Sequence, residues 1–161
     1  MSSLLKLIKN DGYCFSEFRS TVRSEPHLIN ERDNDGATPL HRACERGDTL
    51  ASNLLLAWGA DPNERDKHGF TPLHYAVVSG QSAAVSLMLE NFANPNAKSK
   101  SGKTPLHVLA CCKEGKSTSK IAELLIDYRA LPKDFDYEGY QPLYYAMKSQ
   151  NMDLIRVLDR R

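Results

Sequence analysis

Apolar residues recur at positions i, i+3 and i+4 in four segments of the chain, the spacing that places them on one face of a helix. Their first members lie 33, 37 and 33 residues apart. A nearly fixed period of this length indicates an internal repeat in which every copy contributes one amphipathic helix. The four sets are Ala51, Leu54 and Leu55; Ala84, Leu87 and Met88; Ile121, Leu124 and Leu125; and Leu154, Val157 and Leu158.

A second motif keeps the same period and precedes these helices. Thr-Pro-Leu-His begins at Thr38, Thr71 and Thr104, and a weaker copy, Gln-Pro-Leu-Tyr, begins at Gln141. Thr before Pro is typical of a helix start, because the hydroxyl can cap the helix and Pro at its first position loses no hydrogen bond. Each copy therefore predicts a short first helix. The longer offset of 37 predicts an insertion between the two helices of the third copy, near 111–119, which we expect to form a mobile loop.

A hairpin between successive copies should need a positive φ, which only glycine adopts at low cost. The glycines that fit are Gly36, Gly69, Gly102 and Gly139. Phe92 and Arg129 stand where Gly59 ends the corresponding second helix, so we expect those turns to be strained or differently built. Gln141 and Tyr144 replace Thr and His in the last copy, which should cap its helix less well.

This pattern resembles the ankyrin repeat, and the resemblance covers roughly residues 30 to 158. It implies an all-α solenoid of stacked helix-turn-helix units with projecting hairpins. Because a single unit cannot bury its own apolar face, neighbouring units must supply the core. We expect one domain over residues 1–161. Its parts would be a divergent N-terminal capping unit (1–34), full repeats at 35–67, 68–100 and 101–136, and a C-terminal capping repeat (137–161).

The composition of the chain indicates in which cellular compartment the protein lies, but it says little about what the protein binds. Lys and Arg number 21 against 20 Asp and Glu, so charge argues neither for nor against a nucleic acid or a membrane surface. No segment approaches the ~18 apolar residues of a membrane span, and the apolar start is too short for a secretory signal. Four cysteines without CxxC spacing suggest free thiols. We therefore expect a cytoplasmic protein, with the nucleus as a second compartment, or a host-cell location if the source is a pathogen or virus.

Three histidines, one in each full copy, invite a metal hypothesis: His41, His74 and His107. They belong to different helix pairs, and packed helices lie about 8–10 Å apart. Ligands of one zinc ion must all lie about 2 Å from it, so these histidines cannot share an ion. The resemblance implies a structural role in which each bridges neighbouring loops by hydrogen bonds. We find no GxSxG, HExxH or Walker-type motif, and we expect no catalytic site, no cofactor and no metal.

The adjacent cysteines Cys111 and Cys112 are poorly placed for a disulfide or a metal clamp. Packing is the simpler interpretation. A redox-sensitive thiol is the alternative, since Lys113 and Lys116 could lower a thiol pKa.

The resemblance implies that a protein partner binds the concave side, which hairpin tips and exposed first-helix positions form. The hairpin positions are Arg32, Asn34, Asp35 and Ala37; Arg65, Lys67, His68 and Phe70; Lys98, Lys100, Ser101 and Lys103; and Tyr137, Glu138 and Tyr140. The helix positions are Glu45, Arg46, Val78, Ser79, Cys111, Cys112, Lys148 and Ser149. Phe70, Tyr137 and Tyr140 are the expected aromatic anchors. The alternative is that they pack on neighbouring hairpins.

The sequence thus predicts a non-enzymatic adaptor or inhibitor that acts by holding a protein partner. The alternative is binding of a nucleic acid or acidic ligand through the basic patch Lys98–Lys120, which the near-zero net charge disfavours. A third hypothesis is a scaffold domain that forms homo-oligomers. We expect a monomer that makes no membrane contact.

Overall fold

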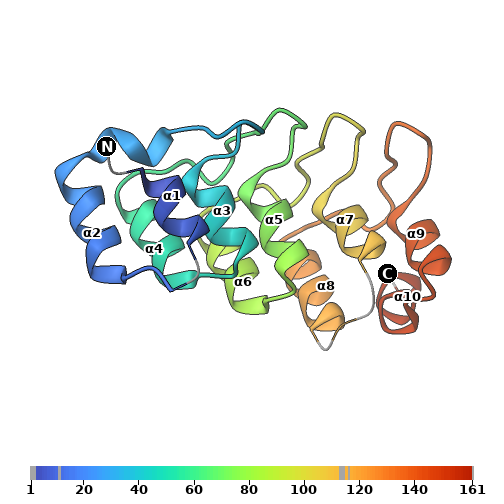
Figure 1. Cartoon of the computed structure of the whole chain (residues 1–161). Helices are drawn as coiled ribbons and strands as arrows, with labels where there is room; N and C mark the ends of the chain where they lie inside the picture. Colours follow the sequence, from blue (N-terminus) through green and yellow to red (C-terminus); the bar gives the residue numbers. More distant parts are fainter. Residues whose placement is uncertain (1–2, 11, 113–114, 116, 161) are drawn as a thin grey trace.

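The computed structural model describes residues 3–10, 12–112, 115 and 117–160, and these residues contain helices and no β-strand (Figure 1). The helices are α1 (Leu4–Lys9), α2 (Phe15–Ser24), α3 (Pro39–Glu45), α4 (Thr49–Ala57), α5 (Pro72–Ser79), α6 (Ser82–Glu90), α7 (Pro105–Cys111), α8 (Thr118–Asp127), α9 (Pro142–Lys148) and α10 (Met152–Asp159). A short 3-10 helix, Pro26–Asn30, follows α2. None of the described helices has the length and apolar character that crossing a membrane requires.

The helices form two parallel rows. Figure 1 shows α1, α3, α5, α7 and α9 side by side in one row and the even-numbered helices in the other, with hairpins projecting from one edge. Each helix packs on its partner in the same unit and on its counterpart in the next unit. We call the outward side of α1, α3, α5, α7 and α9, together with the hairpins, the first-helix face. The predicted all-α repeat solenoid is confirmed.

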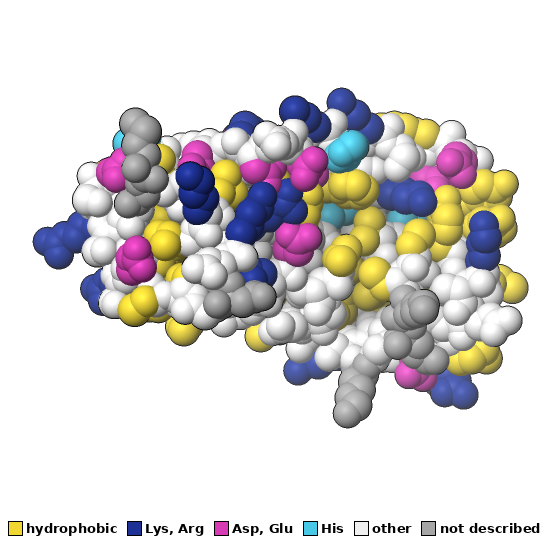
Figure 2. All heavy atoms as spheres, viewed as in Figure 1, with side chains coloured by type: hydrophobic (Ala, Val, Ile, Leu, Met, Phe, Trp, Pro, Cys, Tyr) yellow, Lys and Arg dark blue, Asp and Glu magenta, His cyan; other side chains and the backbone are white. Residues whose placement is uncertain are grey.

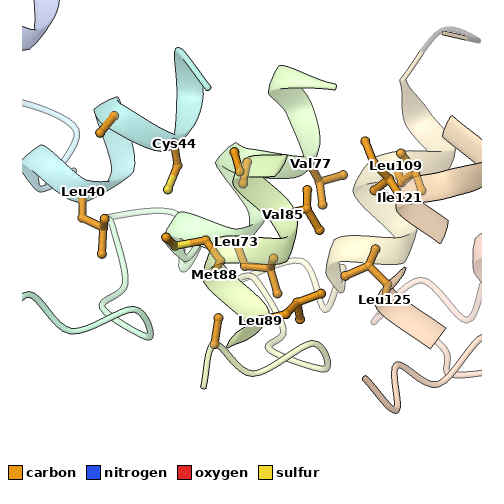
Figure 3. Close-up of a cluster of buried hydrophobic side chains, with 14 of the residues drawn as sticks. Leu40, Cys44, Leu73, Val77, Val85, Met88, Leu89, Leu109, Ile121 and Leu125 are labelled. Atoms are coloured by element: carbon orange, nitrogen blue, oxygen red, sulfur yellow. The ribbon is translucent and has the colours of Figure 1, made fainter. Parts of the chain in front are cut away.

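The core is a continuous layer between the two rows, because each unit covers the apolar side of its neighbour. Figure 3 shows a part of it, where buried side chains of α3, α5, α6, α7 and α8 lie together. At the N-terminal end Phe18 and Val22 are fully buried, as expected of an inward-facing cap. Leu7, which we also expected to face inward, is only half-buried, and Ile8 is fully buried.

The first helices start where the sequence predicts, and the mechanism is the same in three units. The Thr71 backbone N–H donates to His74 Nδ1 at 3.0 Å, so the imidazole proton sits on Nε2. This Nε2–H donates to the Lys103 carbonyl in the next hairpin, at 3.1 Å. The other two histidines do the same, His41 to the Phe70 carbonyl and His107 to the Tyr140 carbonyl.

These histidines are neutral structural bridges. Burial lowers the pKa of all three imidazoles, to about 4 for His74, because a charged ring would lose its hydration. Both ring nitrogens of each are engaged with the protein, which leaves no lone pair for a metal. Among the described residues, no three His, Cys, Asp or Glu side chains lie together as metal ligands would.

The last unit lacks the Thr–His capping arrangement of the other three, as its sequence predicts. Helix α9 has no side-chain cap, since Gln141 Nε2 donates instead to the Lys133 carbonyl at 3.0 Å. Tyr144, at the histidine position, stacks on Tyr140 with ring centroids 4.1 Å apart. The final first helix therefore lacks a histidine bridge of its own, and the Tyr144 ring packs on Tyr140 in its place.

Neighbouring hairpins are joined by backbone hydrogen bonds, such as the one from the Lys100 N–H to the His68 carbonyl at 2.8 Å. Gly69 has a φ of 79°, and a Cβ there would lie 2.9 Å from the Lys100 nitrogen. Glycine is thus required at this turn for two reasons. The backbone has a positive φ, and the next hairpin lies too close to leave room for a Cβ.

The turns after α6 and α8 keep the left-handed conformation without glycine. Gly59 has a φ of 93°, and its counterparts Phe92 and Arg129 have φ values of 65° and 69°. The predicted strain is therefore present, since non-glycine residues are disfavoured in this region.

The connection from α7 to α8 is longer than the other connections within units, as the period of 37 predicts. It runs over residues 112–117, whereas residues 46–48 and 80–81 join the corresponding helices of the two preceding units. The expected mobility of this loop concerns residues 113, 114 and 116, which lie outside the described residues.

Candidate functional site

One side chain at the base of each hairpin determines its shape. Asp33, Asp66, Ser99 and Asp136 occupy this position. Asp66 Oδ1 accepts the N–H groups of His68 and Phe70 at 2.8 and 2.9 Å, which closes the turn. The other three side chains accept the same two N–H groups of their own hairpins.

The second carboxylate oxygen ties the hairpin to the first helix that follows it. Tyr75 donates its hydroxyl to Asp66 Oδ2 at 2.9 Å, and Tyr145 donates to Asp136 Oδ2 at 2.6 Å. Burial raises the pKa of Asp136, but the Tyr145 hydroxyl and two backbone N–H groups outweigh it, so this pKa lies below its ordinary value. The aspartate therefore stays ionised and accepts all three hydrogen bonds.

In the first hairpin an arginine makes the same link. Arg42 Nη2 donates to Asp33 Oδ2 at 2.7 Å. Burial raises the pKa of Asp33, but Arg42 and Lys9 overcome this and hold it at about 2. Arg42 also binds Asp35 and Glu45, and its guanidinium lies 5.6 Å from the centre of the Tyr75 ring.

The third hairpin lacks this cross-link. Ser99 closes the turn with its hydroxyl, which accepts from Ser101 and Lys103, but it has no second oxygen. Val108 stands on α7 where Arg42, Tyr75 and Tyr145 stand on the other first helices. Both partners of the link are therefore missing from the same unit.

An apolar hollow of about 240 Å³ lies at this place, between α5 and α7 on the first-helix face. Val78 is 56% exposed beside it, unusually open for a valine. Figure 2, which views the same side as Figure 1, shows hydrophobic side chains gathered over the middle and C-terminal first helices. The hollow is lined by Glu45, Phe70, His74, Tyr75, Val78 and Val108.

The charges beside the hollow are asymmetric. On the α3 side, Glu45 is paired with Arg42 at 2.9 Å. On the α9 side, the Lys103 ammonium lies 4.4 Å from the centre of the Tyr145 ring and 3.9 Å from Cys111 Sγ. Within the described part of the chain, no carboxylate forms an ion pair with Lys103. The charge of Lys103 on the α9 side is therefore not balanced by an ion pair with any described residue.

Four of the residues expected to contact a partner instead join one hairpin to another, among them Lys67, whose Nζ donates to the Asn34 carbonyl at 2.7 Å. Arg32 Nη1 donates to the Arg65 carbonyl at 3.0 Å, Arg65 donates to the Lys98 carbonyl, and Lys98 Nζ donates to the Phe135 carbonyl at 2.9 Å. Lys98 also pairs with Asp134. Each cation is thus engaged by the neighbouring unit.

The remaining predicted contact residues lie at the surface, with one exception. Ala37 is fully buried, so the expectation that it contacts a partner was wrong; its backbone N–H donates to Asp33 and the side chain faces the core. Phe70, Ser79, Lys103 and Cys112 are half-buried. The exposed residues are Asn34, Asp35, Glu45, Arg46, His68, Val78, Lys100, Ser101, Cys111, Tyr137, Glu138, Tyr140, Lys148 and Ser149.

The expected aromatic anchors differ in their surroundings. Tyr137 is 70% exposed, whereas Tyr140 stacks on Tyr144 and Phe70 lies edge-on to His74 with ring centroids 5.3 Å apart. Packing on neighbours thus accounts for part of the surface of Phe70 and Tyr140.

The two cysteines of the first-helix face, Cys111 and Cys112, both have thiol pKa values above the ordinary value. Burial raises the pKa of Cys111 despite the nearby Lys103 ammonium, and burial also raises the pKa of Cys112. The predicted influence of Lys113 and Lys116 lies outside the described residues.

Sequence reasoning missed Tyr75 and Val108, two of the residues that line the hollow. A signal was present, because Arg42, Tyr75, Val108 and Tyr145 share one position of the repeat and only Val108 has a small aliphatic side chain.

Comparison with known proteins identifies the repeat. A family model described as ankyrin repeats (3 copies) matches residues 4–99 and 87–159. The chain is 53% identical over 34 residues to the ankyrin repeat and LEM domain-containing protein 1 homolog of Caenorhabditis elegans, over 21% of this chain and 5% of that protein. It is 35% identical over 49 residues to a putative ankyrin repeat protein (NMB1133/NMB1171) of Neisseria meningitidis serogroup B, over 30% of this chain and 19% of that protein. The chain thus spans less than a fifth of either relative.

Proposed function

The chain belongs to the ankyrin-repeat family, and we propose that it is a non-catalytic adaptor or inhibitor that holds a protein partner on its first-helix face. Ankyrin repeats are generally protein–protein interaction modules. The observation that carries the proposal is the apolar hollow between α5 and α7, with the exposed Val78 at its edge. Exposed apolar surface framed by polar side chains is typical of a protein-binding site.

The titratable groups around the hollow support a binding role rather than catalysis. His74 is engaged at both ring nitrogens, and the Tyr75 hydroxyl is bound to Asp66. Burial raises the pKa of Tyr75, and its hydrogen bond to Asp66 raises it further. Neither the His74 imidazole nor the Tyr75 hydroxyl is therefore placed to exchange a proton with a bound molecule.

The partner surface we propose combines the hollow with the exposed predicted residues, including Tyr137, Lys100 and Lys148. Arg32, Arg65 and Lys98 contribute indirectly, by joining the hairpins to one another. We further propose that the protein works as a monomer. The unpaired cysteines support a reducing compartment such as the cytoplasm.

The alternative of nucleic-acid binding through Lys98–Lys120 has weaker support. Lys98 is paired with Asp134, and the formal net charge of the chain is only +1. Binding to DNA or RNA with a steep salt dependence would favour that alternative.

The test begins with affinity capture from the source cell, using the full chain as bait, and continues with the captured protein in purified form. We expect Phe70→Ala to weaken direct binding by about tenfold, the usual effect of losing an interface anchor. The control is Glu123→Lys, an exposed change on α8 in the opposite row, which should bind like the wild type. Loss of binding in the control with retention in Phe70→Ala would overturn the assignment of the face.

A further inference from the structure

The hollow lies where the repeat places an aromatic ring in two other units. Tyr75 on α5 and Tyr145 on α9 occupy the repeat position that Val108 holds on α7. Their hydroxyls bind Asp66 and Asp136, while the corresponding residue of the third hairpin is Ser99. The third unit thus lacks both the ring and the acceptor that would hold it.

The size of the hollow is compatible with a ring. Its volume is about 240 Å³, and an apolar cavity of roughly 150 Å³ in another protein takes up benzene. Phe70 and Tyr75 form part of its wall, and their rings can pack edge-to-face with an entering ring. Val78 and Val108 supply the aliphatic part of the wall.

The charges beside the hollow indicate which chemical group would lie next to an aromatic ring that enters it. Lys103 lies on the α9 side of α7, with its ammonium 3.9 Å from Sγ of Cys111, which follows Val108 by one helical turn. In the described residues it has no carboxylate partner, whereas Glu45 on the opposite side is paired with Arg42. An acidic group beside the ring on the α9 side would pair with Lys103.

We propose that the hollow receives one aromatic side chain of a protein partner, and that an acidic residue of the same segment pairs with Lys103. The partner's ring takes the place that Tyr75 and Tyr145 fill in their own units. This inference rests on the proposed function and names the chemistry that the first-helix face recognises.

The test uses a displayed library of random 12-residue peptides selected on the full chain. The peptides recovered should carry Tyr, Phe or Trp with Asp or Glu nearby. Val108→Tyr fills the hollow from within, so it should lower the affinity of these peptides at least tenfold. Lys103→Gln should lower it about threefold. Replacing the aromatic residue of a peptide by Ala should abolish its binding.

Two further variants make the result specific. Leu50→Tyr adds the same ring at an exposed position of α4, in the opposite row, and should leave the affinity unchanged. Val78→Glu places a charge at the exposed edge of the hollow and should weaken binding as Val108→Tyr does. It serves as the second test if Val108→Tyr folds poorly, and thermal melting establishes which variants are folded.

The outcomes separate this inference from the proposed function. Peptides that bind Val108→Tyr and Val78→Glu normally but are lost with Phe70→Ala would overturn the inference and leave the first-helix face as the binding site. Peptides that no first-helix-face variant affects would overturn both. Recovery of no binding peptide, or of peptides without an aromatic residue, would also overturn the inference.

Discussion

The unit that contains α5 and the unit that contains α7 share the same capping and bridging hydrogen bonds, which we call the shared frame. They differ in the outward link, the hydrogen bond from the side chain at the base of the hairpin to the first helix. Both begin with a Thr–His cap, and both histidines bridge to the next hairpin. Only α5 has the carboxylate–tyrosine link, Asp66 to Tyr75, because Ser99 and Val108 replace that pair at α7. The groups that stack one unit on another are therefore the same. The outward link, in contrast, can be omitted, and its omission at α7 coincides with the apolar hollow.

The largest expected effect tests the shared frame. His74→Leu and His107→Leu should each lower the free energy of unfolding by about 3 kcal/mol, because a buried backbone N–H and a carbonyl lose their partners. Denaturant unfolding measures both. If the losses in the free energy of unfolding of the two variants differ by more than about 1 kcal/mol, the histidine bridges do not contribute equally in the two units.

A pH effect of somewhat smaller size should appear at His74. Its pKa is about 4 in the folded protein and about 6.5 in the unfolded chain, so between these pH values only the unfolded chain binds the proton. The stability that neutral His74 provides is complete above pH 6.5 and is lost as the pH falls toward 4. We expect a loss on the order of 2 kcal/mol at pH 4.5 from this residue alone.

The other titrating groups can be separated from His74 in this experiment. His41 and His107 shift in the same direction, whereas the lowered pKa of Asp33, about 2, acts only below roughly pH 4. The His74→Leu protein should lose correspondingly less stability between pH 7 and 4.5. An NMR titration that placed the pKa of His74 at 6 or above would contradict the buried, neutral bridge.

Exchanging the outward link between the two units should give effects of about 1–2 kcal/mol with opposite signs. Asp66→Ser with Tyr75→Val should destabilise the protein, since it loses a hydrogen bond and the packing of a ring. Ser99→Asp with Val108→Tyr should add about 1 kcal/mol by building the link at α7. Double-mutant cycles from denaturant unfolding give the coupling energy of each pair. A coupling near zero for Asp66 and Tyr75 would show that the link does not stabilise α5.

The smallest effect concerns the turns that end the second helices of the two units. Phe92→Gly and Arg129→Gly should each raise stability by about 0.5–1 kcal/mol, because glycine relieves the left-handed strain at a partial cost in unfolded-state entropy. Phe92 is 88% exposed, so the substitution removes little packing. Gly59→Ala is the reverse control and should lower the melting temperature. A decrease with Phe92→Gly would show that its ring makes a stabilising contact.

The local features of the fold were predictable from sequence because each depends on residues close together in the chain. Thr71, Pro72 and His74 define a helix start within four positions, and Gly69 defines the turn before it. The repeat multiplies these signals, so the stacked architecture followed from the period. Even the strained turn at Phe92 was visible as a departure from the pattern.

The roles of surface side chains were less accessible to sequence reasoning. Arg32 has its partner carbonyl on Arg65, 33 residues away, so the sequence could not distinguish a link between hairpins from a free surface cation. The hollow exists because Val108, Val78 and Tyr75 of adjacent units meet beside Phe70, and its volume depends on how closely those units approach. The sequence by itself determined the units and their order, since these follow from short-range preferences and periodicity. Only the tertiary structure decided which surface side chains bind the neighbouring unit and which stay exposed, because that depends on distances across the stack.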